Sequence, residues 1–243
     1  LYRANIECDF ADHTVTDLSK YKVIIVPPLY VASDQELEKL NEFARNGGSL
    51  ILYFKSGFCD ENVQVRTERM PAVLRKACGF NYQQFTNFEK LPLTHNPFNV
   101  SDDENYVSVW GELLNPESAD VLARYDHPHW GRYAAITQNK FGKGTVTYLG
   151  SLPSPAILKK IIKNAVVHAG INEPTHNYAF PVIIRNGVNQ SGELVHYMIN
   201  YSPQPVETIY HFNKGTDIFS KQIIQNDESI EIEAWDLRIV IER

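Results

Sequence analysis

Cysteine is scarce in this chain of 243 residues, which has only three, Cys8, Cys59 and Cys78. No two of them form a C-x-x-C pair, so neither a zinc ribbon nor a thioredoxin-like redox site is predicted. An odd number of widely spaced cysteines also argues against a disulfide framework. We therefore expect a reducing compartment, the cytoplasm.

Long apolar runs and an excess of positive charge are also missing. The longest apolar runs, such as Val23–Pro28, are far shorter than the roughly 20 residues of a membrane span, and no signal segment opens the chain. Lys and Arg total 23 against 29 Asp and Glu, a formal net charge of −6. This balance excludes a polybasic nucleic-acid surface. Because the chain begins at Leu1 without a methionine, we expect it to be a piece or a processed product of a longer protein.

The first part reads as a strand, a helix and a second strand. Lys22–Val26 is a β-branched run that suits a buried strand of a parallel sheet. Ser33-Asp34-Gln35-Glu36 is a capping box that starts a helix, which Gly47-Gly48 end. Ser49–Phe54 is the second strand. A strand, helix and strand of these lengths predict a parallel βαβ crossover.

The pattern is less regular further along. Pro71 and Gly79 bound a predicted helix, and Ser154 caps another that runs through Ala169. Residues 86–105 are polar and are predicted to form a long surface loop. Phe141-Gly142-Lys143-Gly144 reads as a hairpin turn. The strands predicted in this part are Ile6–Phe10, Tyr82–Phe85, Tyr106–Trp110, Val121–Tyr125, Ala134–Gln138 and Thr145–Leu149.

After Ile171 the helix signals stop. Asn172–Asn177 has no periodicity and is predicted to be a linker. His196, Met198 and Asn200 alternate with apolar neighbours, which is typical of a sheet with one wet face. We therefore predict two domains, residues 1–172 and 173–243, the second a small antiparallel β domain. Its predicted strands are Phe180–Arg185, Leu194–Tyr201, Val206–His211, Ser229–Glu233 and Asp236–Glu242.

Cys59 is the sharpest candidate for chemistry, because it follows a strand as the nucleophile of many hydrolases does. However, Glu61 occupies the place where that turn needs a small residue, and neighbouring carboxylates work against a thiolate. We interpret Cys59 as a cysteine beside a turn, with a Cys-dependent amidotransferase or peptidase-like enzyme as an alternative. Cys8 and Cys78 are predicted to be small core residues.

Histidines suggest no site by themselves. His127-Pro128-His129-Trp130 could bind a metal, but no acidic or thiol partner stands at ligand spacing, so we interpret it as a loop with a packed Trp. His168 lies near a predicted helix C-terminus, where a positive charge is favoured.

Carboxylates and aromatic residues leave further alternatives open. Glycoside hydrolysis needs two carboxylates about 5–10 Å apart, but a solvated face accounts equally well for Glu112, Glu117 and Asp120. Aromatic side chains could stack on sugars or pack in a core; those considered are Trp110, Trp130, Tyr133 and Tyr148. The residues therefore predict no catalytic, cofactor-binding or metal-binding group, and no cofactor.

Several segments, in this order and spacing, resemble the C-terminal part of glycoside hydrolase family 42 β-galactosidases. The resemblance covers nearly the whole chain. It rests on Asp17–Pro27, Asn46–Ile51, Lys55–Asn62, Leu74–Gly79, Ala119–Tyr125 and Asn139–Gly150.

The resemblance implies a flavodoxin-like trimerisation domain, akin to class I glutamine amidotransferases, followed by a small β domain. It implies an α/β fold with a parallel sheet, preceded by a further strand and most of a helix before Leu1. The family's two catalytic Glu lie in an N-terminal TIM barrel that nothing here resembles, so no catalytic residue is assigned and this chain alone is not expected to be an enzyme.

By the same resemblance, the expected role is non-catalytic, as the trimerisation and accessory region of an enzyme that hydrolyses terminal β-D-galactosides. The expected partners are two further copies and the barrel. A carbohydrate-binding module is a further alternative, using Tyr197, Tyr201, Tyr210 and Trp235.

Overall fold

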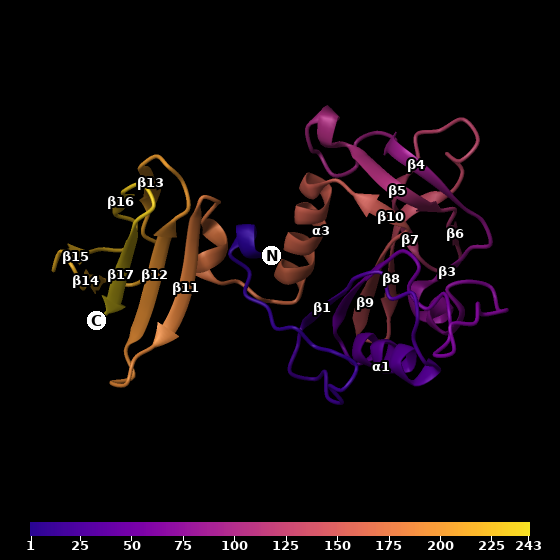
Figure 1. Cartoon of the computed structure of the whole chain (residues 1–243), viewed down its shortest axis with the longest axis horizontal. Coiled ribbons are helices and arrows are strands. Elements are labelled where there is room, and N and C mark those ends of the chain that lie inside the picture. The colour runs from indigo at the N-terminus through magenta and orange to yellow at the C-terminus, as the bar shows by residue number, and fades with distance from the viewer. The chain divides into compact units, whose positions relative to one another are not determined.

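The computed structural model describes residues 1–243 and divides into two compact units (Figure 1). One unit is Ala11–Gly170. The other combines Leu1–Phe10 with Ile171–Arg243. The division into domains at residue 172 stays a prediction. No helix is long and apolar enough to cross a membrane.

The unit Ala11–Gly170 opens with the predicted crossover. Strand β1 (Val23–Val26) pairs in parallel with β2 (Ser49–Tyr53), and helix α1 (Asp34–Arg45) joins them. The capping box is confirmed: the Ser33 side chain accepts from the Glu36 amide, and the Glu36 carboxylate accepts from the Ser33 amide at 2.7 Å. Local sequence therefore sets the first three elements.

Replacing Ser33 by alanine should lower the free energy of unfolding by about 1 kcal/mol, because the first turn of α1 loses its cap. Urea unfolding measures the change. Ser191→Ala, at an exposed serine of the other unit, is the control and should leave stability nearly unchanged. Equal effects of the two substitutions would contradict a capping role for Ser33.

The expected flavodoxin-like, parallel-sheet α/β domain is wrong. The main sheet is mixed, in the order β1-β2-β9-β8-β7. Strand β9 (Gly144–Leu149) is parallel to β2, but β8 (Ala134–Phe141) and β7 (Asp120–Arg124) run antiparallel to their neighbours. The cause is the hairpin at Gly142-Lys143, because a two-residue connection reverses the chain and cannot join parallel strands. The hairpin itself was predicted correctly.

The regular elements between β2 and β8 are mostly strands, which further departs from alternating strands and helices. Strands β4 (Phe85–Pro92), β5 (Tyr106–Glu112) and β10 (Ser151–Pro153) form an antiparallel sheet in the order β10-β5-β4. The prediction of a surface loop over 86–105 is therefore wrong for its first third. Short strands β3 (Phe80–Asn81) and β6 (Asn115–Pro116) also pair.

Helices are few. The segment that Pro71 and Gly79 bound forms a 3₁₀ turn, η2 (Ala72–Leu74), and a single α turn, α2 (Arg75–Cys78). A second 3₁₀ turn, η3 (Asp102–Glu104), lies between β4 and β5. Helix α3 (Pro155–His168) begins at the predicted cap, where Ser154 accepts from the Ile157 amide.

The core of this unit lies between α1, α2 and the mixed sheet. Leu37 and Leu40 of α1 pack in one cluster with Leu50 and Leu52 of β2. The hairpin approaches the end of α1 so closely that a Cβ at Gly144 would overlap the backbone oxygens of Ala44 and Gly48. Only glycine fits there, which fixes β9 beside β2.

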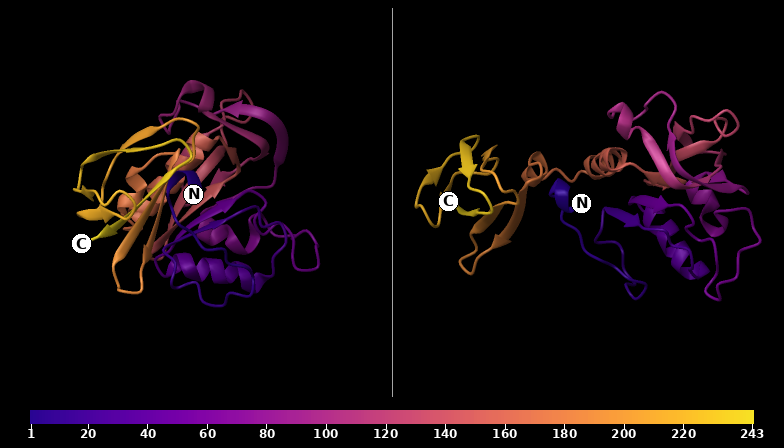
Figure 2. Two further views of the ribbon diagram at one scale, coloured as in Figure 1. Left: turned by 60° about the vertical axis from the view of Figure 1, so that its left-hand side comes forward. Right: turned by 45° about the horizontal axis from the view of Figure 1, so that its top comes forward.

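The C-terminal unit contains only antiparallel strand pairs. Its main sheet has the order β11-β12-β17-β14-β15, and a second pair joins β13 to β16. Figure 2 shows β11, β12 and β17 side by side. The elements are η1 (Tyr2–Ala4), η4 (Pro174–Asn177), β11 (Val182–Val188), β12 (Leu194–Asn200), β13 (Val206–Ile209), β14 (Gly215–Asp217), β15 (Ile223–Ile224), β16 (Ser229–Ile232) and β17 (Leu237–Glu242).

The polar positions of β12 face the core rather than water. His196, Met198 and Asn200 are buried. His196 is satisfied there by hydrogen bonds to Asn186 Oδ1 at 2.8 Å and Glu242 Oε1 at 3.0 Å. The predicted linker contains η4, and the strand predicted over Ile6–Phe10 is wrong, because this segment has no ladder partner.

Asn5 attaches the N-terminal segment to this unit. It is fully buried with a left-handed backbone, φ 55°. Its side-chain amide donates to the carbonyls of Tyr178 and Val182 at 3.3 and 3.0 Å. It also accepts from the Ile184 amide at 2.8 Å.

Candidate functional site

Four aromatic rings on the unit Ala11–Gly170 stack in a continuous row, which we call the aromatic ladder. Tyr30 stacks on Phe58 at 5.5 Å between centroids, Phe58 meets Phe85 edge-on at 5.8 Å, and Phe85 stacks on Trp110 at 4.6 Å. Three different elements supply them: the segment after β1, the segment after β2, and the hairpin β4–β5. The sheet topology therefore collects these rings from distant parts of the sequence.

Two of the four ladder rings are exposed to solvent, and Phe58 and Trp110 are half-buried. Phe85 is 47% exposed and Tyr30 41%, and the neighbouring Val31 and Val109 are also exposed. Isolated exposed apolar residues are ordinary, but a contiguous apolar patch marks an interaction surface.

A single cation lies on the ladder. The Lys55 ammonium is 3.9 Å from the centroid of the Trp110 ring and 5.8 Å from that of Tyr30. Aromatic rings attract a cation placed over their faces, which holds the ammonium at this position.

Two residues beside the ladder have a strained backbone. Lys55 has φ 61° and Val109 has φ 72°. A β-branched residue with positive φ is a true outlier, and such strain costs of order 1–3 kcal/mol and persists only where surrounding structure holds it. At Val109 the strand pairing with β4 is irregular, since the register shifts between Phe88 and Lys90.

Glu112 provides part of that support. It is fully buried, and its Oε1 accepts from the Lys55 amide at 2.8 Å and from the Trp110 indole at 3.4 Å. Its Oε2 accepts from the Tyr148 hydroxyl at 2.8 Å. One carboxyl group thus fixes both the strained lysine backbone and the last ring of the ladder.

Burial raises the pKa of the Glu112 carboxyl to about 7, although the three hydrogen bonds favour its charged form. The nearby carboxyl in turn adds to the effect of burial in raising the pKa values of Tyr125 and Tyr148. The solvated-face interpretation is therefore wrong for Glu112. Glu117 and Asp120 are exposed, as that interpretation requires.

One of the three cysteines differs in burial from the prediction. Cys59 is fully buried, and its backbone bridges Val31 and Val65 beside the ladder. A buried thiol is a poor nucleophile because a substrate cannot reach it. Cys78 lies in the core as predicted, but Cys8 is exposed, so its predicted core position is wrong.

The histidine candidates have structural partners. His127 stacks on Trp130 at 3.9 Å and accepts from the His129 and Trp130 amides, so this loop does contain a packed Trp. His168 ends α3 and contacts the Asn164 carbonyl at 2.7 Å. No group of three or more His, Cys, Asp or Glu is placed to hold a metal ion.

The aromatic residues considered for sugar stacking divide between core and surface. Tyr148 and Tyr210 are fully buried, whereas Tyr197, Tyr201 and Trp235 are exposed. Tyr201 meets Tyr2 edge-on at 6.2 Å. Trp110, singled out from the sequence, belongs to the ladder. Phe58 and Phe85 were missed because nothing local in the sequence shows that they meet.

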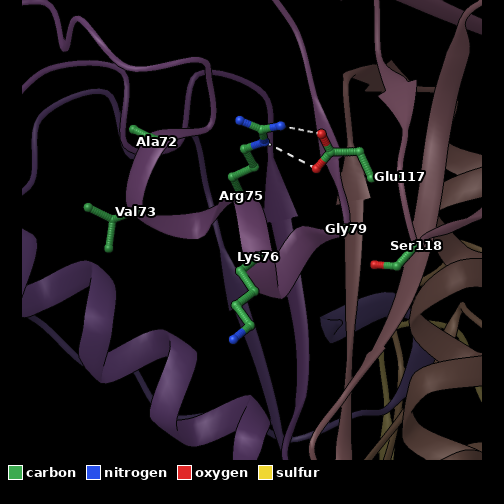
Figure 3. A pocket seen from close by; sticks show the side chains of 7 residues that line it. All are labelled: Ala72, Val73, Arg75, Lys76, Gly79, Glu117 and Ser118. Carbon is green, nitrogen blue, oxygen red and sulfur yellow. Dashed lines mark hydrogen bonds and ion pairs between the residues drawn. The ribbon is translucent and has the colours of Figure 1, made fainter.

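A shallow hollow of about 430 Å³ lies beside α2 (Figure 3). Arg75 and Glu117 point toward each other at its edge and form a bidentate ion pair, while Lys76 points away from them. Asn81 donates to the same carboxylate at 2.7 Å. Arg75, Glu117 and Asn81 therefore satisfy one another at the edge of the hollow.

Comparison with known proteins settles the family. Residues 1–172 match the model of the β-galactosidase trimerisation domain. The chain belongs to this family. All residues of the aromatic ladder lie within the matched part of this trimerisation domain.

Curated relatives agree with the match. The domain is 33% identical over 172 residues to β-galactosidase BgaB from Geobacillus sp. strain Y412MC61, a match that covers 71% of this chain and 25% of that protein. The chain is 25% identical over 233 residues to β-galactosidase BgaA from Planococcus sp. strain SOS Orange, a match that covers 93% of this chain and 34% of that protein. The chain thus spans about a quarter to a third of the length of these relatives.

A solved structure shares the fold. The crystal structure of β-galactosidase from Bacillus circulans sp. alkalophilus superposes with a TM-score of 0.85 at 22% identity, covering 100% of this chain and 36% of that one. At this identity the likeness establishes the fold alone.

Proposed function

We propose that this chain is the non-catalytic assembly region of a cytoplasmic β-galactosidase and joins three copies of that enzyme. The observation that carries the proposal is the match of residues 1–172 to the trimerisation domain. The parent enzyme would hydrolyse terminal β-D-galactosides in carbohydrate metabolism, with its catalytic groups on an N-terminal barrel outside this chain. The names of the curated relatives support that activity.

The exposed aromatic ladder supports an assembly role. Interfaces are enriched in aromatic residues at their centre, and the ladder has this composition. The burial of Cys59 favours this proposal over a thiol-dependent enzyme. We propose further that residues 1–172 and 173–243 act as the assembly domain and an accessory domain.

Light scattering of the purified chain over a concentration series tests the proposal. One chain has a mass of 27.8 kDa, so we expect the weight-average mass to rise toward three times that value. A mass that stays at one chain over the whole series would contradict assembly by this region.

A further inference from the structure

The carboxyl group of Glu112 is buried among neutral hydrogen-bond donors. Its Oε1 accepts from the Lys55 amide and the Trp110 indole, and its Oε2 accepts from the Tyr148 hydroxyl. The ammonium of Lys55 lies over the Trp110 ring, 3.9 Å from its centroid, and not among these donors. A buried charge without a cationic partner is costly, and a carboxyl group avoids this cost by taking up a proton.

The titratable groups packed around this carboxyl keep their own protons near neutral pH. Burial raises the pKa of each of them, and the nearby Glu112 adds to that rise. Glu112 is therefore the group in this cluster that can gain or lose a proton near neutral pH. The surrounding groups are Cys78 of α2, Tyr82 after β3, Tyr125 after β7 and Tyr148 of β9.

The two oxygens of Glu112 differ in what they can do with a proton. Both donors on Oε1 are N–H groups, which cannot accept a hydrogen bond, whereas the Tyr148 hydroxyl on Oε2 can donate or accept. A proton on Oε2 can therefore be donated to Tyr148, whose own proton then needs an acceptor. The buried Tyr82 hydroxyl lies beside both groups and has no hydrogen-bond partner in the structure. A buried polar group without a partner calls for an explanation, and accepting from Tyr148 when Glu112 is protonated provides one.

We infer that Glu112 is a buried proton switch that sets how firmly Lys55 and Trp110 are held. When the carboxyl is ionised, both N–H groups donate to a charged oxygen, and such bonds are roughly twice as strong as neutral ones. When Oε2 takes up a proton from solvent, one O–H bond forms, no other covalent bond changes, and Oε1 becomes a weaker, neutral acceptor. The inference goes beyond the proposed assembly function and does not depend on it.

The position of the switch gives it an effect outside the core. Lys55 has a strained backbone, φ 61°, and strain of this kind persists only where the surrounding structure holds it. Trp110 is the last ring of the aromatic ladder. Proton uptake therefore loosens one residue that depends on the bond for its conformation and one that lies at the surface.

Proton–nitrogen NMR spectra of the full chain between pH 5 and pH 9 test the switch. Because both N–H groups donate to the same oxygen, the signals of the Trp110 indole and the Lys55 amide should move together, with one midpoint near pH 7. In Glu112→Gln both signals should stay at their wild-type low-pH positions, since the amide reproduces the protonated arrangement. The indole signal of the exposed Trp235 in the other unit is the internal control and should not follow this titration.

The wild-type titration decides the inference without any variant. A Trp110 indole signal that stays constant from pH 5 to pH 9, or that titrates near pH 4.5 as an ordinary glutamate would, would overturn the switch. Different midpoints for Trp110 and Lys55 would overturn their control by one carboxyl group. A titration that persists in folded Glu112→Gln would assign the proton to another group and would also overturn it.

Tyr148→Phe tests the place of the proton. The variant removes a hydrogen bond that lowers the pKa of Glu112, so the midpoint of the Trp110 signal should rise by about one pH unit. Tyr125→Phe is the matched control, because the Tyr125 hydroxyl is also buried but donates to the backbone carbonyl of Glu112 at 2.9 Å. It should leave the midpoint nearly unchanged. Equal midpoints in the two variants would overturn the assignment of the proton to Oε2 beside Tyr148.

Discussion

Wild type is expected to lose about 3 kcal/mol of its free energy of unfolding as the pH rises from 4.5 to above 7, and replacing Glu112 by glutamine should abolish this loss. Burial raises the pKa of this carboxyl from 4.5 to about 7, and one pKa unit corresponds to about 1.4 kcal/mol. In this pH window the folded chain keeps the proton that the unfolded chain has released. The contribution of Glu112 is therefore fully present below pH 4.5 and lost as the pH rises through 7.

The glutamine variant has no such loss, since its side chain does not titrate, and its amide oxygen can still accept from the Lys55 amide. Urea unfolding of both proteins from pH 4 to pH 8 measures the effect. As the pH rises, the free energy of unfolding of the variant should exceed that of wild type by an increasing amount. Glu117→Gln is the control, because Arg75 lowers the pKa of Glu117, so that its contribution changes only below pH 4.5 and its difference from wild type should stay nearly constant above that pH. A constant difference between wild type and Glu112→Gln across this range would contradict the raised pKa.

The second large effect is expected at Asn5. Asn5→Ala should lower the free energy of unfolding of the C-terminal unit by about 4 kcal/mol. The substitution removes three hydrogen bonds to the backbone of Tyr178, Val182 and Ile184, each worth about 1 kcal/mol and buried. It also places alanine at φ 55°, which costs about 1 kcal/mol more.

Asn99→Ala separates the contribution of the hydrogen bonds from the cost of alanine at a positive φ. Asn99 also has a positive φ, 49°, but it is exposed and has no side-chain bond to distant backbone, so only the conformational cost of about 1 kcal/mol applies. Hydrogen exchange of the β11 amides reports the stability of the C-terminal unit for Asn5→Ala, and exchange of the β5 amides reports the stability of the unit that contains Asn99. Equal losses for the two variants would show that the three hydrogen bonds contribute nothing.

Local signals in the sequence identified elements well where a single segment carries the information. The capping box at Ser33 and Glu36 and the hairpin at Gly142-Lys143 both form as predicted. These features depend on a few adjacent residues, so the sequence contains them directly.

Local sequence patterns did not indicate whether neighbouring strands run parallel or antiparallel. The β-branched run of a parallel strand and that of a buried antiparallel strand look alike. The expectation of a flavodoxin-like sheet followed from one real crossover, β1-α1-β2, and from the family resemblance. Strands β8 and β7 then proved antiparallel. Strand β4 was missed because its alternate residues are polar and exposed.

The candidate site was even less accessible to sequence analysis. Trp110 was singled out as an aromatic residue, but Tyr30, Phe58 and Phe85 come together only through the fold. Glu112 was grouped with exposed carboxylates, and nothing in Trp110-Gly111-Glu112 indicates that this one is buried. Burial of a charged group is a tertiary property, which depends on what packs around it.

The attachment of Asn5 has a consequence for synthesis. The ribosome makes Leu1–Phe10 before any other part of this chain, yet the backbone groups that Asn5 binds belong to residues 178–184. The unit Ala11–Gly170 emerges entirely in the interval and has its own core. Leu1–Phe10 can therefore reach its place only after residues 178–184 have emerged, and the unit Ala11–Gly170 can fold while the segment before it is still unattached.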